Sequence, residues 1–404
     1  MPSVRSVSIG FFFTVGSRYE ASELSGVSHL IEHMLFKGSE QFPTAQAISE
    51  AIEGVGGLLD AGTDKELTVY SAKIASKHFE LAIGLMADMV RHPRFEPAEL
   101  DKERRVIIEE LGMYRDSPAD WVSVLGDEMF WPDLPLGREV AGTRETVESI
   151  SRAAMADYWT RHYVPGSLVV SIVGDVTHER ALEATTRLLG DWQPAPTPPW
   201  QPSPPPSGVA RVRLETRKTE QTNFCLYTPG LPHRHDDDYA LSLLHVILGD
   251  GMSSRLFQEV RERQGLAYDV GTAPVHFHDT GAFVVSAGVE PRRTEAALTA
   301  ILAELARIHD VPVSAAELHR AKEYSKGRMA LRLEDTSSVA SWLGGQEALL
   351  NEIHELDETM ARLDAVTVED IQHVARALFT DEWLRLAVIG PNKHTEKLEQ
   401  VLHL

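Results

Sequence analysis

The sequence is poor in cysteine, in long apolar runs and in basic residues. Cys225 is the single cysteine, so no disulfide can form within the chain, which favours a reducing compartment. No apolar run approaches the roughly 20 residues that span a bilayer, so no membrane partner is expected. A formal net charge of −21 argues against nucleic acid as the main partner, because the phosphate backbone is itself negative.

The length and the placement of proline predict more than one domain. A chain of 404 residues exceeds one typical hydrophobic core. Proline is dense in residues 193–207, QPAPTPPWQPSPPPS, and such a stretch favours a stiff, extended connector. We therefore predict domains at 1–192 and 209–404 with a linker at 193–208. Because no basic leader with a cleavage site is visible, we expect a cytoplasmic protein, or a periplasmic one if a signal has been removed.

The two halves carry a faint internal repeat. Tyr163–Asp175 aligns with Phe379–Pro391 at an offset of 216 residues, and Ser71–Glu80 aligns with Ser286–Glu295 at an offset of 215. In each half, strand-like runs are followed by runs of helical spacing. This order predicts an α+β fold of two homologous domains, each a mostly antiparallel sheet packed by helices.

The expected elements follow from apolar periodicity in each half. The first half is predicted to hold strands at Val7–Val15, Leu67–Ile74 and Ser167–Val173, and helices around His29–Leu35, at Lys77–Arg91 and at Glu99–Tyr114. The second is predicted to hold strands at Val209–Thr216, Thr222–Thr228, Gly281–Val289 and Trp383–Ile389, and helices at Leu241–Leu248, Arg293–Asp310 and Ser314–Arg332. Since Val209–Thr216 has no counterpart in the first half, the first domain is expected to lack about one strand at its start.

The strongest motif is H-x-x-E-H, formed by His29, Glu32 and His33. Composition alone predicts fewer than about 0.1 such matches in a chain of this length. Ser28–Phe36 has helical spacing, and on a helix His29 and His33 lie one turn apart on one face. Two imidazoles so placed suit Zn²⁺, and Glu32 lies near enough to handle a metal-bound water. The alternative is that both histidines are structural, in the core or at the surface.

A third ligand is expected because a catalytic zinc usually has three protein ligands and one open position. Glu110 lies 77 residues after His33, on the predicted acidic helix. Glu103 lies seven residues before Glu110, two turns away on the same face, where it can support a ligand. Glu109 competes with Glu110 for the ligand role. The alternative is that all of these glutamates belong to a solvated helix face.

These residues together resemble the inverzincin motif of the M16 metallopeptidases, which include pitrilysin, insulin-degrading enzyme and the mitochondrial processing peptidase. The size is similar to that of the short-chain M16B branch, and the resemblance covers essentially the whole chain. It implies a LuxS/MPP-like metallohydrolase fold and a zinc-dependent endopeptidase that hydrolyses unfolded peptides or oligopeptides. It implies one Zn²⁺ per chain held by His29, His33 and Glu110. By the same resemblance, Glu32 is the general base that activates water with the zinc, and Glu103 is the carboxylate behind the ligands.

Two further segments resemble substrate-binding parts of the family. Arg261 and Tyr268 resemble the pair that grips substrate in the C-terminal half; the alternative is a charged helix followed by a turn and strand. Gly57–Lys73 resembles the active-site edge strand, with Asp60 and Ala61 where many members have Asn-Ala. Such a strand can bind an extended peptide through main-chain hydrogen bonds.

The second half is not expected to bind zinc at the corresponding place. At the offset of 216, His245 aligns with His29. Leu248 and Gly249 stand where the first half has Glu32 and His33. The chemistry is therefore predicted in the first domain only.

The resemblance also implies an assembly. Family members with four such domains form a closed chamber, and two-domain members pair to make one. We therefore expect a homodimer, or a heterodimer with an M16 paralogue, in which Arg261 and Tyr268 of one subunit face the zinc of the other. The alternatives are a catalytically inactive partner subunit that binds peptides as a scaffold, and an assembly core like the related subunits of a respiratory complex.

Two further histidine groups have local interpretations. His233 and His235 precede the acidic run Asp236–Asp238, which we interpret as a loop and helix start, where acids suit the helix dipole, with metal binding as the alternative. His276 and His278 alternate in a strand-like run and are interpreted as surface or rim residues.

Overall fold

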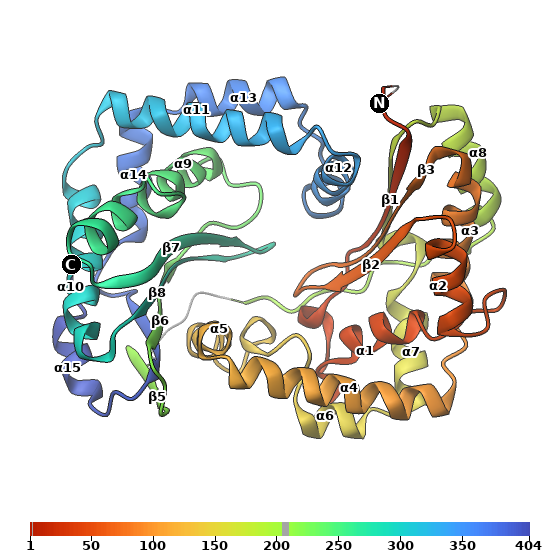
Figure 1. Cartoon of the computed structure of the whole chain (residues 1–404), viewed down its shortest axis with the longest axis horizontal. Helices are drawn as coiled ribbons and strands as arrows, with labels where there is room; N and C mark the ends of the chain where they lie inside the picture. The colour runs from red at the N-terminus through yellow and green to blue at the C-terminus, as the bar shows by residue number, and fades with distance from the viewer. Residues whose placement is uncertain (2, 204–209) are drawn as a thin grey trace. The chain divides into compact units, whose positions relative to one another are not determined.

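The computed structural model describes residues 1, 3–203 and 210–404. The chain divides into two compact units (Figure 1). The first unit comprises Met1–Gly112, Arg138–Gln201 and Ala330–Ile353, and the second comprises Met113–Gly137, Pro202–Met329 and His354–Leu404. The predicted linker at 193–208 lies partly outside the described residues, as does the first residue of the predicted strand Val209–Thr216.

The first unit is built on a sheet whose strand order, within the part of the chain that the structure describes, is β2-β3-β1-β4. Its strands are β1 (Ser6–Phe13), β2 (Leu58–Thr63), β3 (Thr68–Ala75) and β4 (Leu168–Gly174). Neighbouring strands in it are antiparallel. Alternate apolar residues of β1 and β3 enter one core with the helices, and these are Val7, Ile9, Phe11, Phe13, Tyr70, Ala72 and Ile74. The period of two thus sets one face of the sheet against the helices.

The helices of the first unit begin and end where apolar faces and capping residues set their limits. They are α1 (Val27–Leu35), α2 (Ala45–Glu53), α3 (Phe79–Arg91), α4 (Pro97–Asp116), α6 (Arg144–Ser149), α7 (Arg152–His162), α8 (His178–Leu189) and α12 (Thr336–Leu350). The last turn of α4, from Met113 on, belongs to the second unit. Hydroxyl side chains cap several starts; Thr44, for example, accepts the Ala47 N–H at 3.1 Å at the start of α2.

The second unit repeats this plan. Its sheet has the order β5-β9-β6-β8-β7 over the described residues. The strands are β5 (Val212–Thr216), β6 (Thr222–Pro229), β7 (Ala267–His276), β8 (Gly281–Val289) and β9 (Arg385–Gly390). Strands β7-β8-β6-β9 correspond in order to β2-β3-β1-β4 of the first unit. Strand β5, which pairs parallel to β9, has no counterpart beside β4 among the described residues.

Helices of the second unit surround that sheet. They are α5 (Pro118–Phe130), α9 (Asp238–Gly249), α10 (Thr294–Asp310), α11 (Ala315–Arg332), α13 (Leu356–Ala365), α14 (Val368–Leu378) and α15 (Thr395–Val401), together with a π-helix at Phe257–Arg263. The last turn of α11, from Ala330 on, belongs to the first unit.

The two halves of the sequence exchange one helix each. Helix α12, from the second half, packs on β1 and β4 of the first unit, as its blue ribbon beside the red β1 in Figure 1 shows. Helix α5, from the first half, packs on the corresponding strands β6 and β9 of the second unit. Each sheet is therefore covered on one face by a helix from the other half of the sequence.

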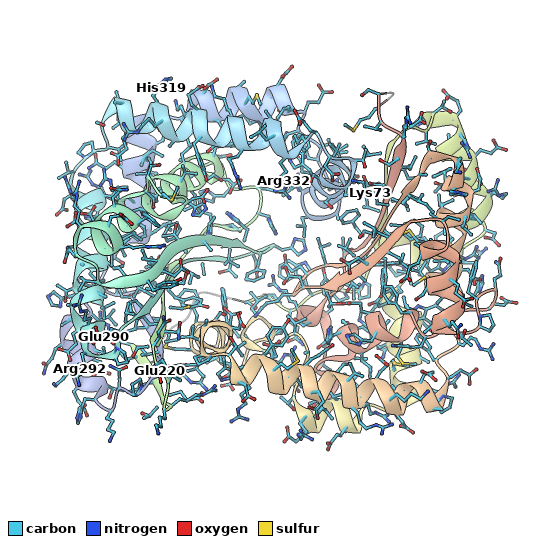
Figure 2. All side chains as sticks on the ribbon, viewed as in Figure 1. Lys73, Glu220, Glu290, Arg292, His319 and Arg332 are labelled. Atoms are coloured by element: carbon cyan, nitrogen blue, oxygen red, sulfur yellow. The ribbon has the colours of Figure 1, made fainter. Side chains whose placement is uncertain are left out.

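Close packing and polar bonds hold α12 in place. A side chain at Gly344 would place its Cβ 2.2 Å from the Phe12 ring, so glycine permits the close approach of helix and strand. The Ser8 hydroxyl lies 2.8 Å from that of Thr336. Lys73, labelled in Figure 2, forms an ion pair with Asp335 at the start of the helix. Both charges are partly exposed, so the pair contributes little beside the apolar contact.

The predicted fold class is confirmed. Both sheets are mostly antiparallel, both are packed by helices, and the strand order repeats between the halves. The helices predicted at Lys77–Arg91 and Arg293–Asp310 are α3 and α10, and the strand predicted at Gly281–Val289 is β8. In the described residues, every helix is too short or too polar to cross a bilayer.

Candidate active site

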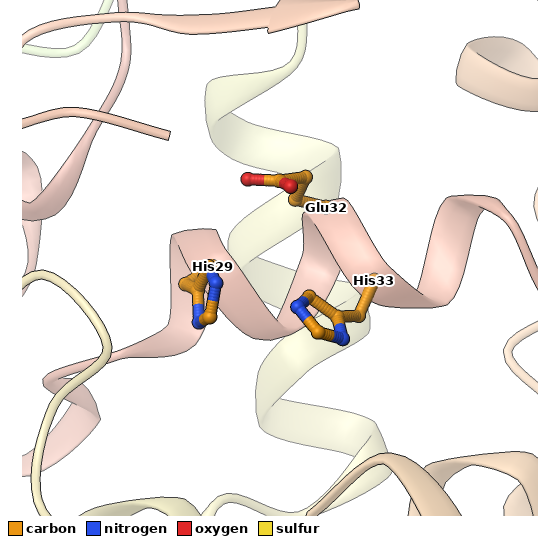
Figure 3. Close-up of side chains that lie close together, drawn as sticks. All are labelled: His29, Glu32 and His33. Atoms are coloured by element: carbon orange, nitrogen blue, oxygen red, sulfur yellow. The ribbon is translucent and has the colours of Figure 1, made fainter. Parts of the chain in front are cut away.

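Helix α1 carries the H-x-x-E-H motif on one face. Its apolar residues Leu30, Ile31, Met34 and Leu35 are buried in the core of the first unit. His29, Glu32 and His33 are thereby left half-buried on the remaining face (Figure 3). One ligand atom from each of the three lies within 4.8 Å of the others. The predicted helical placement of the motif is therefore what the structure has.

The start of α1 is fixed by a buried carboxylate. Gly26 precedes the helix with φ 92°, a conformation that favours glycine, and no side chain of its own caps the helix. Glu20 supplies the cap, because its oxygens accept the N–H groups of Gly26 and Ser28, each at 2.8 Å. Burial raises the pKa of Glu20 to about 7 in spite of these hydrogen bonds. Glu20 thus helps to position the histidines that follow.

Helix α4 brings two glutamates to His33. Glu103 Oε2 lies 3.1 Å from His33 Nδ1, and Glu110 Oε2 lies 3.6 Å from His33 Nε2. Lys37 holds the other oxygen of Glu103 at 2.9 Å. Glu109, the competitor for the ligand role, is exposed to solvent. Since a carboxylate only accepts, His33 donates its Nδ1–H to Glu103 and keeps the Nε2 lone pair toward Glu110.

The two histidines titrate differently. Burial, together with the charge of His33, lowers the pKa of His29 to about 4, so this ring is neutral at neutral pH. Burial also acts to lower the pKa of His33, but the Glu103 hydrogen bond and the charges of Glu110 and Glu32 outweigh it and raise that pKa. A neutral imidazole binds metal, whereas a proton on His33 competes with metal for the ring.

The residues fit a metal ion on an observation independent of the motif. The Nδ1 atom of His29 is buried, and within the described residues it has no hydrogen-bond partner. Buried polar atoms are nearly always paired, so an unpaired imidazole nitrogen in a group with Glu32 and a second imidazole, His33, fits a donor set for a metal ion.

Glu32 is oriented by the edge strand. The Thr63 hydroxyl, at the end of β2, donates to Glu32 Oε2 at 2.5 Å. Burial raises the pKa of Glu32 above its usual value, and the charges of Asp60 and Glu110 act in the same direction. A carboxylate with a raised pKa is better matched to accepting a proton near neutral pH than an ordinary one. The motif alone does not reveal the role of Thr63.

Asp60 and Ala61 lie on β2, which pairs with β3 on one side only in the described part of the chain. Asp60 is exposed and its carboxylate accepts the N–H of Ala61 at 2.9 Å. A cavity of about 500 Å³ adjoins this strand, with Phe36, Leu58 and Asp60 among its walls. The strand therefore has an open edge with a cavity beside it, close to Glu32 through Thr63.

Arg261 and Tyr268 lie together in the second unit. The Arg261 guanidinium carbon is 5.6 Å from the centroid of the Tyr268 ring, within cation–π range. Arg261 belongs to the π-helix, a conformation that is frequent at functional sites, and Tyr268 is 73% exposed on β7. The structure thus pairs these two residues with each other, in a different unit from the H-x-x-E-H residues.

The second unit has replaced the metal-site residues. His245 lies on α9, as His29 lies on α1, but its Nδ1 is 2.7 Å from the hydroxyl of Thr272. Leu248, in the place of Glu32, is fully buried in the core. At these two positions the second unit therefore has a hydrogen bond and a hydrophobic contact where the first unit has His29 and Glu32.

Comparisons with known proteins identify the family. Residues 1–144 match the model described as insulinase (peptidase family M16), and residues 149–324 match the model described as peptidase M16 inactive domain. A Bacillus subtilis protein named as an uncharacterized zinc protease is 35% identical over 397 residues, covering 97% of this chain and 94% of the relative. A Streptomyces coelicolor protein, also named as an uncharacterized zinc protease, is 37% identical over 399 residues, covering 97% of this chain and 86% of the relative. The chain belongs to the M16 peptidase family, as the sequence motif predicts.

Solved structures agree on the fold. A protease from Helicobacter pylori has a TM-score of 0.91 at 22% identity, covering 96% of this chain and 94% of that one. A peptidase M16 inactive domain from Pseudomonas fluorescens has a TM-score of 0.90 at 21% identity, covering 97% of this chain and 94% of that one. At these identities the likeness shows the fold, and the names of the sequence relatives support zinc as the metal.

The pairing of His33 with Glu103 gives a testable pH dependence. In the metal-free protein, a folded-state pKa above 6.5 means that protonated His33 stabilises the fold fully below 6.5, and this contribution is lost as pH rises through the raised pKa. Replacing Glu103 by Gln should lower the His33 pKa, because it removes the charge that the ring proton meets. It should also weaken zinc binding by about 10–100-fold.

Imidazole NMR titration of the chelator-treated protein measures this shift, and zinc titration measures the affinity. Glu109→Gln is the matched control, since the same chemical change there removes an exposed charge. An unchanged His33 pKa in Glu103→Gln would contradict the assignment of Glu103.

Proposed function

We propose that the chain is a zinc-dependent endopeptidase that hydrolyses unfolded peptides, with one zinc held by His29, His33 and Glu110. The observation that carries the proposal is the arrangement around His33, whose Nδ1 lies 3.1 Å from Glu103 and whose Nε2 lies 3.6 Å from Glu110. This arrangement orients the ring for a metal on the side of His29 and Glu110. Membership of the M16 family and relatives named as zinc proteases support the same conclusion.

The chemistry follows from the surroundings of each group. Zinc, when bound, supplies Lewis-acid chemistry that polarises a peptide carbonyl and acidifies water. Glu32 accepts the proton of the attacking water and passes it to the leaving amine. The Thr63 hydroxyl donates to its Oε2 and so orients the carboxylate for this role. Glu103 keeps the Nδ1–H of His33 and so maintains the tautomer that the site needs.

Substrate would bind as an added strand along β2. Its open edge offers main-chain hydrogen-bond donors and acceptors. These bind the main chain of an extended peptide, so binding depends little on the sequence of the peptide. The cavity beside Leu58 and Asp60 has room for a substrate side chain. A folded substrate cannot present an extended segment, so unfolded peptides are the substrate class that fits.

Arg261 and Tyr268 would complete the site from a second subunit, as donors to the substrate carbonyl and its developing negative charge. This assignment predicts complementation between two inactive chains. A Glu32→Gln chain mixed with a Tyr268→Phe chain should regain activity, because one of the two sites of the mixed dimer then contains both intact groups. Peptide cleavage before and after subunit exchange measures it, with each variant alone as control. No regain, with exchange shown independently, would place the pair in the same subunit as its zinc or outside the site.

The deciding experiment for the function is metal analysis combined with cleavage of internally quenched peptides blocked at both ends. Zinc-loaded protein is expected to cleave them internally, and chelation followed by zinc addition should abolish and restore cleavage. A chain that takes up zinc at this site but cleaves nothing would instead support the peptide-binding partner subunit. The match of residues 149–324 to the inactive-domain model is compatible with either outcome, since that segment lies outside the zinc motif.

A further inference from the structure

A second group of metal-ligating side chains lies in the first unit, at the C-terminal end of α3. Among the residues that the structure describes, two such groups have one ligand atom from each member within 4.8 Å of the others. One is the H-x-x-E-H group, and the other consists of Glu40, Asp88 and His92. Glu40 lies in the loop between α1 and α2, Asp88 lies in the last turn of α3, and His92 directly follows that helix.

Helical geometry places two members of this group side by side. Asp88 and His92 are four residues apart, and the His92 N–H donates to the Asp88 carbonyl at 2.9 Å, so the helical hydrogen-bond pattern continues to His92. Residues at this spacing lie on one face of a helix, one turn apart. A carboxylate and an imidazole thus face the same side of the end of α3.

The carboxylate of Asp88 is a buried charge without a cationic side chain beside it. Asp88 is 3% exposed. Its hydrogen-bond donors in the described residues are neutral, namely the main-chain N–H of Gln41 at 2.9 Å and the Gln41 side-chain amide at 3.4 Å. Buried charges are ordinarily paired or coordinate a metal ion. A carboxylate can accept about four interactions, so these two leave capacity for a cation.

The third member is brought to the helix end by hydrogen bonds of the main chain. The Glu40 N–H donates to the His92 carbonyl at 3.1 Å, and the Arg94 N–H donates to the Gly38 carbonyl at 3.1 Å. Glu40 Oε2 lies 3.9 Å from His92 Nδ1, too far for a hydrogen bond. Two atoms that each lie about 2.1 Å from one ion can be up to about 4.2 Å apart, so this separation suits a shared cation.

We propose that Glu40, Asp88 and His92 bind one divalent transition-metal ion of the zinc class. One imidazole and two carboxylates are ligands that Zn²⁺ accepts. Glu40 and His92 are exposed, so water can complete the coordination. The ion joins the loop that follows α1 to the end of α3, where main-chain hydrogen bonds already hold the two together, and it therefore stabilises the folded chain.

Zinc titration of the purified full-length chain after chelator treatment tests the site, with bound ions counted by native mass spectrometry. Wild type should bind two equivalents. His92→Ala and Glu40→Gln should each lose one of them. His33→Ala should lose the other equivalent and keep this one, and the double variant His33→Ala/His92→Ala should bind none. Failure of the active-site assignment is thus distinguished from failure of this one.

Thermal unfolding gives a second measurement, independent of peptide cleavage. Zinc should raise the Tm of His33→Ala, because an ion that binds only the folded chain stabilises it. The same zinc concentration should leave the Tm of His33→Ala/His92→Ala unchanged. A rise of equal size in the double variant would contradict the assignment of His92.

Two control variants separate this site from adventitious binding at the surface. His78 lies at the opposite end of α3, and Glu183 is exposed on α8. His78→Ala and Glu183→Gln should keep both equivalents. The proposal is overturned if wild type binds no second equivalent, if His92→Ala and Glu40→Gln retain it, or if the controls lose it as readily. Circular dichroism checks folding, and His92→Gln replaces His92→Ala if the latter fails to fold.

Discussion

Replacing Glu32 by Gln is expected to lower kcat by about 10³-fold or more while zinc content stays at the wild-type level. Glutamine has the same shape and its carbonyl oxygen still accepts the Thr63 hydroxyl, so the helix and the histidines keep their positions. It cannot accept a proton from water, and this step is what the proposed mechanism assigns to Glu32. Steady-state cleavage of a quenched peptide, together with metal analysis, measures both quantities.

Glu109→Gln is the matched control for this experiment. The substitution is chemically identical and lies next to Glu110, but the side chain is exposed and should leave the rate unchanged. In the metal-free protein, Glu32 should titrate above the range of an ordinary carboxyl group, because burial raises its pKa. Cleavage by Glu32→Gln at the wild-type rate would refute the general-base assignment.

Replacing His33 by Ala is expected to remove one equivalent of zinc and all measurable peptide cleavage. His33 contacts both Glu103 and Glu110, so its loss removes a ligand and leaves Glu103, which is 5% exposed, with Lys37 as its remaining ion-pair partner at the site. Two ligands are too few to hold a catalytic zinc. Metal analysis after dialysis, taken as the difference from wild type, measures the loss.

The control for His33→Ala is His178→Ala, which removes an exposed histidine at the start of α8 in the same unit. It should keep the full zinc content and the wild-type rate. A His33→Ala chain with undiminished zinc would take His33 out of the ligand set, and with it the reason for placing Glu103 behind the metal.

The relative positions of active-site residues could be predicted from the sequence where both residues lie on one helix, because helical periodicity then determines their spacing. An i, i+4 spacing on a helix fixes the relation of His29 to His33, and two helical turns fix that of Glu103 to Glu110. The approach of α4 to α1 was inferred from the family resemblance, and the structure has the Glu103 and Glu110 carboxylates beside the His33 ring. The sequence did not predict the contacts of three residues at the site, Thr63, Lys37 and Glu20. These contacts depend on which carboxylate oxygen faces which helix or strand, and periodicity does not determine that.

The limit of local patterns is sharper at three histidines whose rings lie near one another in the second unit, His233, His276 and His278. Read by themselves, His233 and His235 indicate a helix start, and α9 does begin at Asp238. Read by themselves, His276 and His278 indicate the end of a strand, and β7 does end at His276. Their meeting depends on the hairpin register and on one backbone hydrogen bond to Phe277, neither of which leaves a mark in composition or periodicity.

The exchange of α5 and α12 has a consequence for how the chain is made. A ribosome completes β1 about 340 residues before it completes α12, an interval of roughly 20–70 s at ordinary rates of translation. Throughout that interval the face of β1 that carries Phe12 lacks its covering helix, although the opposite face can already pack on α3. The first sheet thus receives its last helix only after α12 has been synthesised. Expressing the two sequence halves as separate proteins would leave each sheet without one of its helices.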